Sequence, residues 1–428
     1  MLGFFYTFEQ MNIEKLYNLF KQYPNICTDS RKIKKASIFF ALKGENFNGN
    51  EFAGKAIDEG CAFAVIDEKQ YAVNKKCILV NDVLSTLQEL AKHHRNQLKI
   101  PIIGITGSNG KTTSKELINA VLNTEKKCYA TKGNLNNHIG VPLSVLEINF
   151  KDEIAIIEMG ANHIDEIAAL CEIARPDFGI ITNIGKAHLE GFGSVGGVKK
   201  AKSELYQFIA KTNGKIFVNN EDNVLLELAA NIKKATYGKS GDYTGTITSE
   251  TPFISLQFGE HLIDSNLIGN YQFSNIMLAI AIGKYFRISD YNIKQSINNY
   301  TPKNNRSQII KTEKNTLILD AYNANPASMN AMLTAFAKQE YNNKLCILGD
   351  MLELGEFSAK EHKSIIQLTH KLVLESIFIG NEFLNVEESA FKNTDEFSEI
   401  LKKNPIKNRT VLLKGSRGIA IEKLIKFL

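Results

Sequence analysis

The sequence has 428 residues, of which 44% are hydrophobic and 23% charged, the composition of an ordinary soluble globular protein. At roughly 150 residues per domain, this length predicts about three domains. The 51 Lys and Arg residues exceed the 46 Asp and Glu residues only enough for a net charge of +5. That excess is too small to indicate a nucleic-acid-binding protein, but it suits an enzyme whose substrates carry phosphates and carboxylates.

The cysteines and the hydrophobic segments indicate a cytoplasmic protein. The six cysteines are widely spaced without a Cys-x-x-Cys pair, which predicts free thiols in a reducing compartment rather than a zinc site. The N-terminus lacks a basic segment and meets Glu9 too early for a signal peptide, and translation could start at Met1 or at Met11. No apolar stretch approaches the ~20 residues that a membrane-spanning helix needs, so we expect no membrane insertion.

The first hundred residues alternate short apolar runs with helical stretches. Residues 37–42 and 62–66 are predicted strands, and a helix is predicted over residues 51–60 between them. Pro101 then begins the next segment. We therefore expect a first α/β domain over residues 1–98.

The middle of the chain repeats the order strand, loop, helix. Short, continuous apolar runs are typical of parallel strands that helices cover on both faces. Such runs are residues 102–106, 154–158, 178–183 and 215–219. Each ends in a polar residue, and open α/β sheets bind ligands at the carboxyl ends of their strands. We expect a central domain over residues 99–301.

Beyond this segment a third α/β domain is predicted, over residues 302–428. Its apolar runs again alternate with helical stretches. The predicted strands are residues 316–320, 345–348, 376–379 and 410–413.

A phosphate-binding loop follows the predicted strand over residues 102–106 and precedes a helical stretch over residues 114–122. Its residues are Gly107, Ser108, Asn109, Gly110, Lys111, Thr112 and Thr113. Glycines let backbone N–H groups turn toward phosphate oxygens, and the helix N-terminus adds partial positive charge. Lys111 can then reach the β- and γ-phosphates, and the Thr112 hydroxyl can bind Mg²⁺.

The loop departs from the generic G-x-x-x-x-G-K-[ST] pattern, because Ile105 stands where the first glycine belongs. A glycine turn without a ligand is therefore an alternative, although the order strand, loop, helix favours a bound nucleoside triphosphate. A nucleotide by itself leaves a kinase, a motor and a ligase open.

Other chemically capable residues follow the strands of the middle region. Glu158 ends its strand, where P-loop proteins place a carboxylate for Mg²⁺, although a solvated carboxylate is the alternative. His188 lies in a glycine-punctuated loop, which is compatible with a site residue or a surface residue. Lys202 and Glu204 would ordinarily belong to a solvated, basic helix face.

Nine short motifs, distributed over the whole chain, carry a resemblance to a known family. They are residues 28–31, 41–44, 106–113, 132–142, 158–161, 187–193, 322–326, 348–356 and 414–417. On these motifs the chain resembles the Mur ligases of peptidoglycan synthesis. Folylpolyglutamate synthetases share the phosphate loop, whereas residues 322–326 and 348–356 resemble the branch of the family that adds D-alanyl-D-alanine.

The resemblance implies an α/β fold of three domains. The N-terminal α/β domain recognises the UDP portion of the substrate, and the central domain is a P-loop ATPase with a mainly parallel sheet. The C-terminal domain is Rossmann-like and binds the incoming dipeptide.

The resemblance also implies the reaction. ATP phosphorylates the terminal carboxylate of UDP-N-acetylmuramoyl-tripeptide, and the amine of D-alanyl-D-alanine then attacks the acyl phosphate and expels phosphate. Positive charge must neutralise crowded anionic oxygens, which is the task of Lys111 and two Mg²⁺ ions.

By the same resemblance, the catalytic residues are Lys111, Glu158, His188 and Lys202. One Mg²⁺ is bound by Thr112 and Glu158, and the second by Glu158 and His188. Lys202 matches the family lysine that CO₂ carbamylates, which converts a cationic side chain into an anionic oxygen ligand.

The binding residues are likewise implied by the resemblance. ATP contacts the phosphate loop together with Asn275 at adenine, Arg306 at phosphate and Asp320 at the ribose or hinge. The UDP portion meets Asp29, Ser30 and Arg31, and the muramoyl peptide borders Asn134, Asn136 and Asn137. D-alanyl-D-alanine is received by Tyr322, Asn323 and Asn325, with Lys414, Ser416 and Arg417 at its carboxylate.

Two other functions are compatible with the phosphate loop. One is a ligase like folylpolyglutamate synthetase, and the other is a P-loop nucleotide-binding regulator without ligase activity. Phosphate release that requires both UDP-tripeptide and D-alanyl-D-alanine distinguishes these from the function above. The third residue of the tripeptide, meso-diaminopimelate or L-lysine, stays open, and a monomer is the default expectation.

Overall fold

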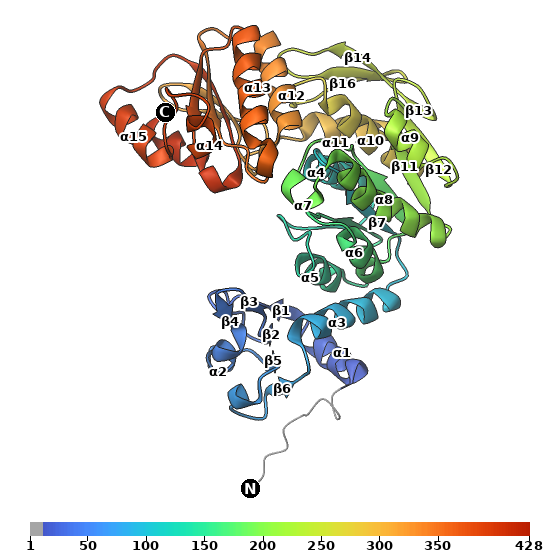
Figure 1. Ribbon diagram of the computed structural model, residues 1–428. Coiled ribbons are helices and arrows are strands. Elements are labelled where there is room, and N and C mark those ends of the chain that lie inside the picture. The colour runs from blue at the N-terminus through green and yellow to red at the C-terminus, as the bar shows by residue number, and fades with distance from the viewer. Residues whose placement is uncertain (1–11) are drawn as a thin grey trace. The chain divides into compact units, whose positions relative to one another are not determined.

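The structure is a computed structural model that describes residues 12–428 (Figure 1). The choice between Met1 and Met11 as the start lies outside the described residues. The chain divides into two compact units. Unit 1 contains the described residues up to Gly104, with Lys126–Ala161 and Glu166–Phe178. Unit 2 contains Ile105–Glu125, Asn162–Asp165 and Gly179–Leu428.

The N-terminal part of unit 1 is built on a four-stranded parallel sheet in the order β1-β2-β5-β6. The strands are β1 (Asn25–Cys27), β2 (Ser37–Phe40), β5 (Phe63–Ile66) and β6 (Cys77–Leu79). The small residues of helix α2 (Ala53–Asp58) pack with β2 and β5 in one hydrophobic core. The predicted helix over residues 51–60 is in fact divided, because a 3-10 turn over Gly49–Phe52 precedes α2.

Helices α1 (Ile13–Gln22) and α3 (Val83–Gln97) also belong to unit 1. Side chains of Asn12 and Asp82 accept backbone N–H groups at their first turns, which supplies partners that helix N-termini otherwise lack. Leu16, Tyr17 and Phe20 are the buried side of α1, at helical spacing.

The strands of the middle region form a seven-stranded sheet in the order β13-β12-β11-β10-β7-β9-β8. They are β7 (Ile102–Thr106), β8 (Cys128–Ala130), β9 (Ile154–Glu158), β10 (Phe178–Ile181), β11 (Lys215–Asn219), β12 (Lys234–Gly238) and β13 (Tyr243–Thr244). Every residue of β7 and β9 is buried, as expected of apolar strands covered on both faces. The pairings β8–β9, β11–β12 and β12–β13 are parallel. The predicted strands over residues 102–106, 154–158 and 215–219 are confirmed to the residue.

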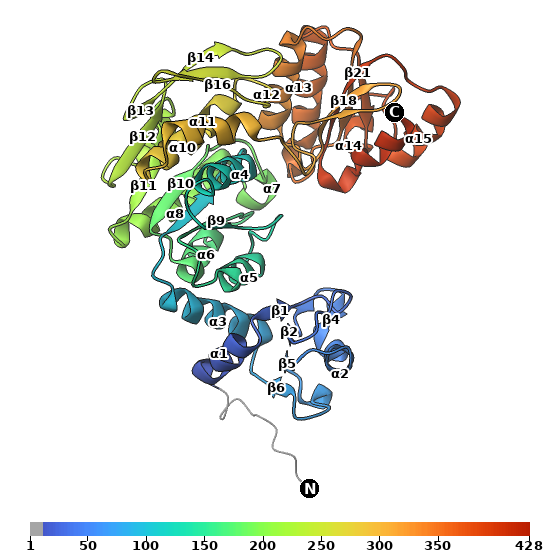
Figure 2. The same cartoon turned by 180° about the vertical axis from the view of Figure 1, so that it is seen from behind.

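Unit 2 also contains a three-stranded antiparallel sheet that the sequence did not predict. Its order is β14-β15-β16, with bounds Thr246–Ser249, Ser255–Phe258 and His261–Asp264. Helix α10 (Gln272–Tyr285) follows it and packs against α4 (Lys111–Leu122) (Figure 2). Nearly all of α10 is buried, including its polar residues Gln272 and Asn275.

The C-terminal part of unit 2 is a five-stranded sheet in the order β17-β18-β21-β19-β20. Its strands are β17 (Gln308–Lys311), β18 (Thr316–Asp320), β19 (Lys344–Gly349), β20 (Ser376–Ile379) and β21 (Thr410–Lys414). Only β17, at the edge, is antiparallel to its neighbour among these strands. Alternate residues of the central strands pack with α15 (Thr394–Lys403) and the final 3-10 helix (Ile421–Phe427). Helices α12 (Pro326–Lys338) and α13 (Ser358–Lys371) cover the other face (Figure 2).

The structure also bears on the cysteines and on membrane-spanning helices. Among residues 12–428 the six cysteines form no disulfide, and five of them are buried. Burial raises the pKa of the Cys346 thiol to about 12, so it is not reactive at neutral pH. Among residues 12–428, no helix combines the length and the apolar character that crossing a membrane requires.

Candidate active site

The phosphate loop occupies the turn between β7 and α4 and needs glycine at two positions. Gly107 has a φ of 143°, and a Cβ there would lie 1.9 Å from Thr182 Oγ1. Gly110 has a φ of 80°, and a Cβ there would lie 2.8 Å from Asn275 Oδ1. Side chains at either position would collide with neighbours and strain the backbone. The predicted strand–loop–helix arrangement is confirmed, although α4 begins at Lys111 rather than at residue 114.

Residues after β10 hold the phosphate loop in place. Thr182 Oγ1 donates to the Asn109 carbonyl at 2.6 Å, and Asn183 Oδ1 accepts the Asn109 N–H at 3.0 Å. The Ser108 hydroxyl accepts the Gly185 N–H at 2.9 Å. Sequence reasoning assigned no role to Thr182 or Asn183. The signal available was a polar pair at the carboxyl end of a buried strand, where ligand sites of parallel sheets form.

The first turn of α4 has the properties of an anion site. Its N-cap is Gly110, so no side chain caps the helix, and Thr112 and Thr113 are buried at its start. Lys111 Nζ donates to the Gly107 carbonyl at 2.5 Å and so lies folded over the loop. Backbone N–H groups, the helix dipole and an ammonium group together favour a phosphate ligand.

Asn275 approaches the phosphate loop from α10. Its Oδ1 accepts the Ser114 hydroxyl at 3.0 Å, and its Nδ2 donates to Gln272 Oε1 at 2.7 Å. These bonds fix the orientation of the amide and join α10 to α4. The expected contact of Asn275 with adenine would use the remaining N–H of this amide.

Glu158 is buried at the end of β9, with 1% of its surface exposed. Asn136 Nδ2 donates to Glu158 Oε1 at 2.9 Å, and the Glu158 N–H donates to Thr131 Oγ1 at 3.0 Å. The interpretation of Glu158 as a solvated carboxylate is therefore wrong. The segment around Asn136 is also organised locally, because Asn137 Oδ1 accepts the N–H groups of Ile139 and Gly140.

Two predicted positions of this segment are exposed. Asn134 and Asn137 are exposed, and the Asn134 carbonyl accepts the Asn136 N–H at 2.8 Å. In the N-terminal part of unit 1, Asp29 accepts Arg31 Nε at 2.8 Å, and Ser30 lies between them in the sequence. This contact lowers the pKa of Asp29 to about 2. Asp29 and Arg31 thus form an exposed, fully charged pair.

His188 is brought beside Glu353, a residue that sequence reasoning gave no role. Nδ1 of His188 lies 2.7 Å from Glu353 Oε2. This distance is that of an ion pair, although the buried Nδ1 does not have the angle of a formed hydrogen bond. The interaction with His188 lowers the pKa of the Glu353 carboxyl. In the same loop, Lys186 Nζ lies 2.6 Å from Glu361 Oε1.

Lys202 and Glu204 lie on α8 (Val195–Lys211), and both are buried. Lys202 is 2% exposed, with Nζ 5.3 Å from the centre of the Phe192 ring. Glu204 Oε1 accepts the Asp165 N–H at 2.8 Å. The expectation of a solvated helix face is wrong for these residues.

Asp320 and Lys414 are opposite each other at the carboxyl ends of β18 and β21. Lys414 Nζ lies 2.5 Å from Asp320 Oδ2, and Lys414 is 1% exposed. Asp320 Oδ1 also accepts the Ser307 N–H at 3.0 Å. The register of the two strands therefore pairs one residue expected at ATP with one expected at the dipeptide.

Two arginines lie against the ring of Tyr322, although they were expected to bind different substrates. The Arg306 guanidinium carbon lies 3.8 Å from the centre of the Tyr322 ring, and that of Arg417 lies 5.9 Å away. Arg306 Nε is buried and has no hydrogen-bond partner among residues 12–428, which leaves it able to bind an anion. Next to this cluster, the Ser416 hydroxyl accepts the Leu352 N–H, and Asn323 Oδ1 accepts the Ala324 N–H.

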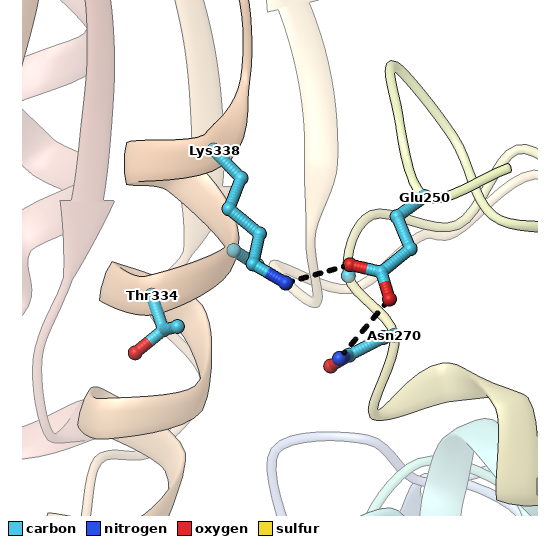
Figure 3. A pocket seen from close by; sticks show the side chains of 6 residues that line it. Glu250, Asn270, Thr334 and Lys338 are labelled. Carbon is cyan, nitrogen blue, oxygen red and sulfur yellow. Dashed lines mark hydrogen bonds and ion pairs between the residues drawn. The ribbon is translucent and has the colours of Figure 1, made fainter.

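Helix α12 joins the phosphate loop to the C-terminal sheet region. Its N-cap Asn325 forms a capping box with Ser328, and Asn325 Nδ2 donates to Asn109 Oδ1 at 2.8 Å. At the other end of α12, Lys338 Nζ lies 2.8 Å from Glu250 Oε2, and Asn270 Nδ2 donates to the same carboxylate (Figure 3). The two ends of one helix are thus anchored, and its N-cap residue contacts the phosphate loop.

Oxygen donors of the kind that Mg²⁺ binds occur in each of the two units, taken separately. Among the described residues, no group of three or more His, Cys, Asp or Glu could hold a metal alone. Mg²⁺ usually binds to one or two carboxylates together with substrate phosphates and water. The buried Thr112 hydroxyl and the buried Glu158 carboxylate are hard oxygen donors of this kind.

Three family descriptions match the chain. The Mur ligase family, catalytic domain, matches residues 22–100, and the Mur ligase middle domain matches residues 105–283. The Mur ligase, glutamate ligase domain, matches residues 305–417. Together these matches extend over most of the sequence.

Individual proteins are similar along nearly the whole chain. The UDP-N-acetylmuramoyl-tripeptide–D-alanyl-D-alanine ligase of Bacillus subtilis (strain 168) is 34% identical over 422 residues, which cover 94% of this chain and 92% of that protein. The ligase of the same name from Haemophilus influenzae is 33% identical over 428 residues, covering 94% and 93%. A crystal structure of MurF from Acinetobacter baumannii superposes with a TM-score of 0.84 at 29% identity, covering 94% and 92%.

Proposed function

Because the chain belongs to the Mur ligase family, and within it to the UDP-N-acetylmuramoyl-tripeptide–D-alanyl-D-alanine ligases, we propose that it joins D-alanyl-D-alanine to UDP-N-acetylmuramoyl-tripeptide at the expense of ATP. The product is a precursor of peptidoglycan. The geometric observation that carries the proposal is the 2.8 Å contact between Asn109 of the phosphate loop and Asn325 of the predicted dipeptide motif. It supports the proposal, because it joins the loop expected to bind ATP to the motif expected to receive the dipeptide.

The reaction proceeds in two chemical steps. The tripeptide carboxylate attacks the γ-phosphorus of ATP, which forms an acyl phosphate and releases ADP. The amine of D-alanyl-D-alanine then attacks the acyl carbon, loses a proton and expels inorganic phosphate from the tetrahedral intermediate. Lys111 and the N–H groups at the start of α4 stabilise the negative charge on the transferred phosphoryl oxygens.

The two Mg²⁺ ions of the proposal would be held by Thr112, Glu158, His188 and carbamylated Lys202. Mg²⁺ supplies Lewis-acid neutralisation of the phosphate oxygens when it is bound. The position of Lys202 supports this role, because its side chain is buried beside Phe192, in the helix that follows the His188 loop.

A substitution tests the role of Lys202. Lys202→Ala should lower the rate of phosphate release by at least about a hundredfold, the scale of losing one strong electrostatic contact in the transition state. Short carboxylates such as acetate should restore part of the rate, because they can replace the carbamate oxygens. Full activity in the variant, or no rescue by any carboxylate, would contradict the proposal.

The binding residues of the proposal fall into three groups. Asp29, Ser30 and Arg31 face the UDP portion, and Asn134, Asn136 and Asn137 border the muramoyl peptide. Tyr322, Asn323, Asn325, Ser416 and Arg417 receive the dipeptide, with Lys414 held by Asp320 beside them. ATP contacts the phosphate loop together with Asn275, Arg306 and Asp320.

Each substrate has its own domain in this proposal. Residues 1–98 recognise the UDP portion, residues 99–301 bind ATP and residues 302–428 bind the dipeptide. The enzyme works as a monomer in the cytoplasm.

One assay tests the proposed function. The protein is incubated with ATP, Mg²⁺ and D-alanyl-D-alanine, with a UDP-tripeptide that carries either meso-diaminopimelate or L-lysine, and the product is weighed by mass spectrometry. The expected product has the mass of the UDP-tripeptide plus the dipeptide minus one water. Phosphate release should require both substrates. Release that is indifferent to them would overturn the proposal in favour of a nucleotide-binding regulator.

A further inference from the structure

The contact between His188 and Glu353 joins two loops that are distant in the sequence. His188 precedes helix α7 (Leu189–Phe192) in a left-handed conformation, with φ of 51°. Its ring meets the edge of Phe192, at a centroid distance of 6.4 Å and an interplanar angle of 82°. Besides the 2.7 Å approach of Nδ1 to Glu353 Oε2, the Glu190 N–H donates to the Glu353 carbonyl at 3.2 Å. Both the backbone and the side chain of Glu353 therefore face the His188 loop.

The loop that presents Glu353 is held by buried partners. The Asp350 carboxylate accepts the N–H groups of Glu382 and Phe383, at 3.0 and 2.9 Å. The Met351 N–H donates to His362 Nε2 at 3.1 Å. These bonds fix the chain two residues before Glu353.

The next residues complete this anchoring. The Leu352 N–H donates to the Ser416 hydroxyl at 2.9 Å, and Leu354 is buried. Glu353 itself has φ of 66°, a left-handed region that is costly for a residue with a Cβ. A glutamate is retained in such a conformation only where the surroundings determine it, and such residues gather at functional sites.

Glu353 approaches Nδ1 of His188, and this determines which ring nitrogen of His188 can bind a metal ion. A neutral imidazole carries one N–H, and a carboxylate at Nδ1 favours the tautomer whose proton is on Nδ1. Nε2 then keeps its lone pair and can bind a metal ion. Metal-binding histidines commonly have their other nitrogen directed by a carboxylate in this way. The imperfect angle at Nδ1 is compatible with this role, because such contacts often tighten only when substrates bind.

We infer that Glu353 is a positioning residue for His188, which fixes the proton on Nδ1 and offers Nε2 to the Mg²⁺ of the ligase reaction. The Mg²⁺ part of this inference rests on the proposed function, whereas the choice of tautomer does not. A purely structural ion pair would hold the two loops together without selecting a tautomer. The acidic motif over residues 348–356 thereby contributes a residue, Glu353, that orients a proposed metal ligand.

The choice of tautomer can be measured in the metal-free protein by nitrogen-15 NMR of the histidine rings. In its neutral form His188 should carry the proton on Nδ1, and comparison with a His188→Asn variant assigns its signal. Glu353→Ala should shift the signal toward the Nε2–H tautomer. Glu353→Gln should preserve the Nδ1–H tautomer, because its amide oxygen can still accept that proton. Glu356→Ala, at an exposed position of the same loop, is the matched control and should change nothing.

Steady-state assays then test the consequence for Mg²⁺. Glu353→Ala should raise the Mg²⁺ concentration for half-maximal rate about tenfold or more, as loss of such a supporting carboxylate does elsewhere. Glu353→Gln should stay within about threefold of the wild type, and circular dichroism should show both variants folded.

Two results would overturn the inference. One is an unchanged tautomer in Glu353→Ala, and the other is equal damage from Glu353→Gln and Glu353→Ala, which would indicate charge rather than positioning. The NMR result does not depend on turnover. A failure of the proposed function would therefore appear as absent ligation with the tautomer shift intact.

Discussion

At the scale of single residues, two glycines with positive φ show what the phosphate loop demands. Gly107 has φ of 143°, and Gly133 has φ of 55°. A Cβ at Gly107 would lie 1.9 Å from Thr182 Oγ1, whereas a Cβ at Gly133 would meet nothing within 4 Å. Both φ values are positive, so the backbone conformation alone does not show which glycine is needed. The two positions differ in how closely neighbouring atoms surround an added Cβ.

We predict that Gly107→Ala will weaken the binding of a non-hydrolysable ATP analogue at least tenfold, because either Thr182 or the loop must move. Gly133→Ala should leave that affinity within about twofold and cost roughly 1–2 kcal/mol of stability from its left-handed backbone. Isothermal titration calorimetry measures the affinities, and urea unfolding measures the stabilities. Wild-type affinity in Gly107→Ala would show that the loop tolerates a side chain.

Candidate site residues could be identified from the sequence, but the residues that they contact could not. The sequence identified Lys111, Glu158 and His188 as candidates from their places after predicted strands. The burial of Lys202 and its position over Phe192 were not foreseen, because a lysine-rich helical stretch ordinarily faces water. Lys414 and Asp320 were assigned separately, and only the register of β18 and β21 makes them a pair.

At the scale of elements, strands with continuous apolar runs were the easiest to predict. The bounds of β7, β9, β11 and β18 match the expected ones, because a polar residue or a glycine ends each buried run. The antiparallel sheet β14-β15-β16 was missed. Its strands are half-exposed and alternate in burial, so they contain no continuous apolar run.

Helix α12 offers a test of the contact between the phosphate loop and the dipeptide motif. Asn325→Ala removes both an N-cap and the hydrogen bond to Asn109. Asn393→Ala removes only the N-cap of α15, where Asn393 accepts the Glu396 N–H. Each variant should lose about 1 kcal/mol of stability. Only Asn325→Ala should also lower kcat/KM for D-alanyl-D-alanine, by about tenfold or more, in the phosphate-release assay.

Equal kinetic losses in Asn325→Ala and Asn393→Ala would show that α12 acts only through general stability. An unchanged kcat/KM in Asn325→Ala would show that the contact with Asn109 carries no function. The loss of activity should not depend on the ion pair of Lys338 with Glu250 at the far end of α12, which is partly exposed and contributes at most about 1 kcal/mol.

At the scale of the whole molecule, a buried histidine makes stability depend on pH. His94 on α3 has Nδ1 3.0 Å from the Tyr17 hydroxyl and Nε2 2.7 Å from the Ile148 carbonyl. Burial lowers the pKa of His94 below its usual value, with a smaller contribution from His93. The unfolded chain therefore binds a proton more readily than the folded one, so this contribution to stability is lost as the pH falls below about 6.5.

We predict that urea unfolding free energies measured between pH 7.5 and 5.5 will fall with a slope that His94 steepens, by at most about 1.4 kcal/mol per pH unit. His94→Gln should flatten the dependence. His163→Gln, at an exposed histidine of unit 2, should leave it as in the wild type. A slope that is the same in all three proteins would contradict the assignment to His94.

The sequence by itself determined the class of the protein and much of its local structure. Apolar runs, glycines and turn residues act on their immediate neighbours, so β7, the phosphate loop and α4 could be placed from a short segment. The family motifs added the reaction. These features depend on backbone preferences and on residues close together in the chain.

Only the tertiary structure decided which side chains meet. Asn325 is 216 residues from Asn109, and Lys414 is 94 residues from Asp320, yet each pair is in contact. Such pairs depend on the order of the strands, on their register and on the helices that pack between them. Short sequence segments do not specify strand order or register. A shift of the register by one residue would turn a side chain to the other face of its sheet. The pairing of His188 with Glu353, and the role we infer from it, became visible for this reason only in the folded chain.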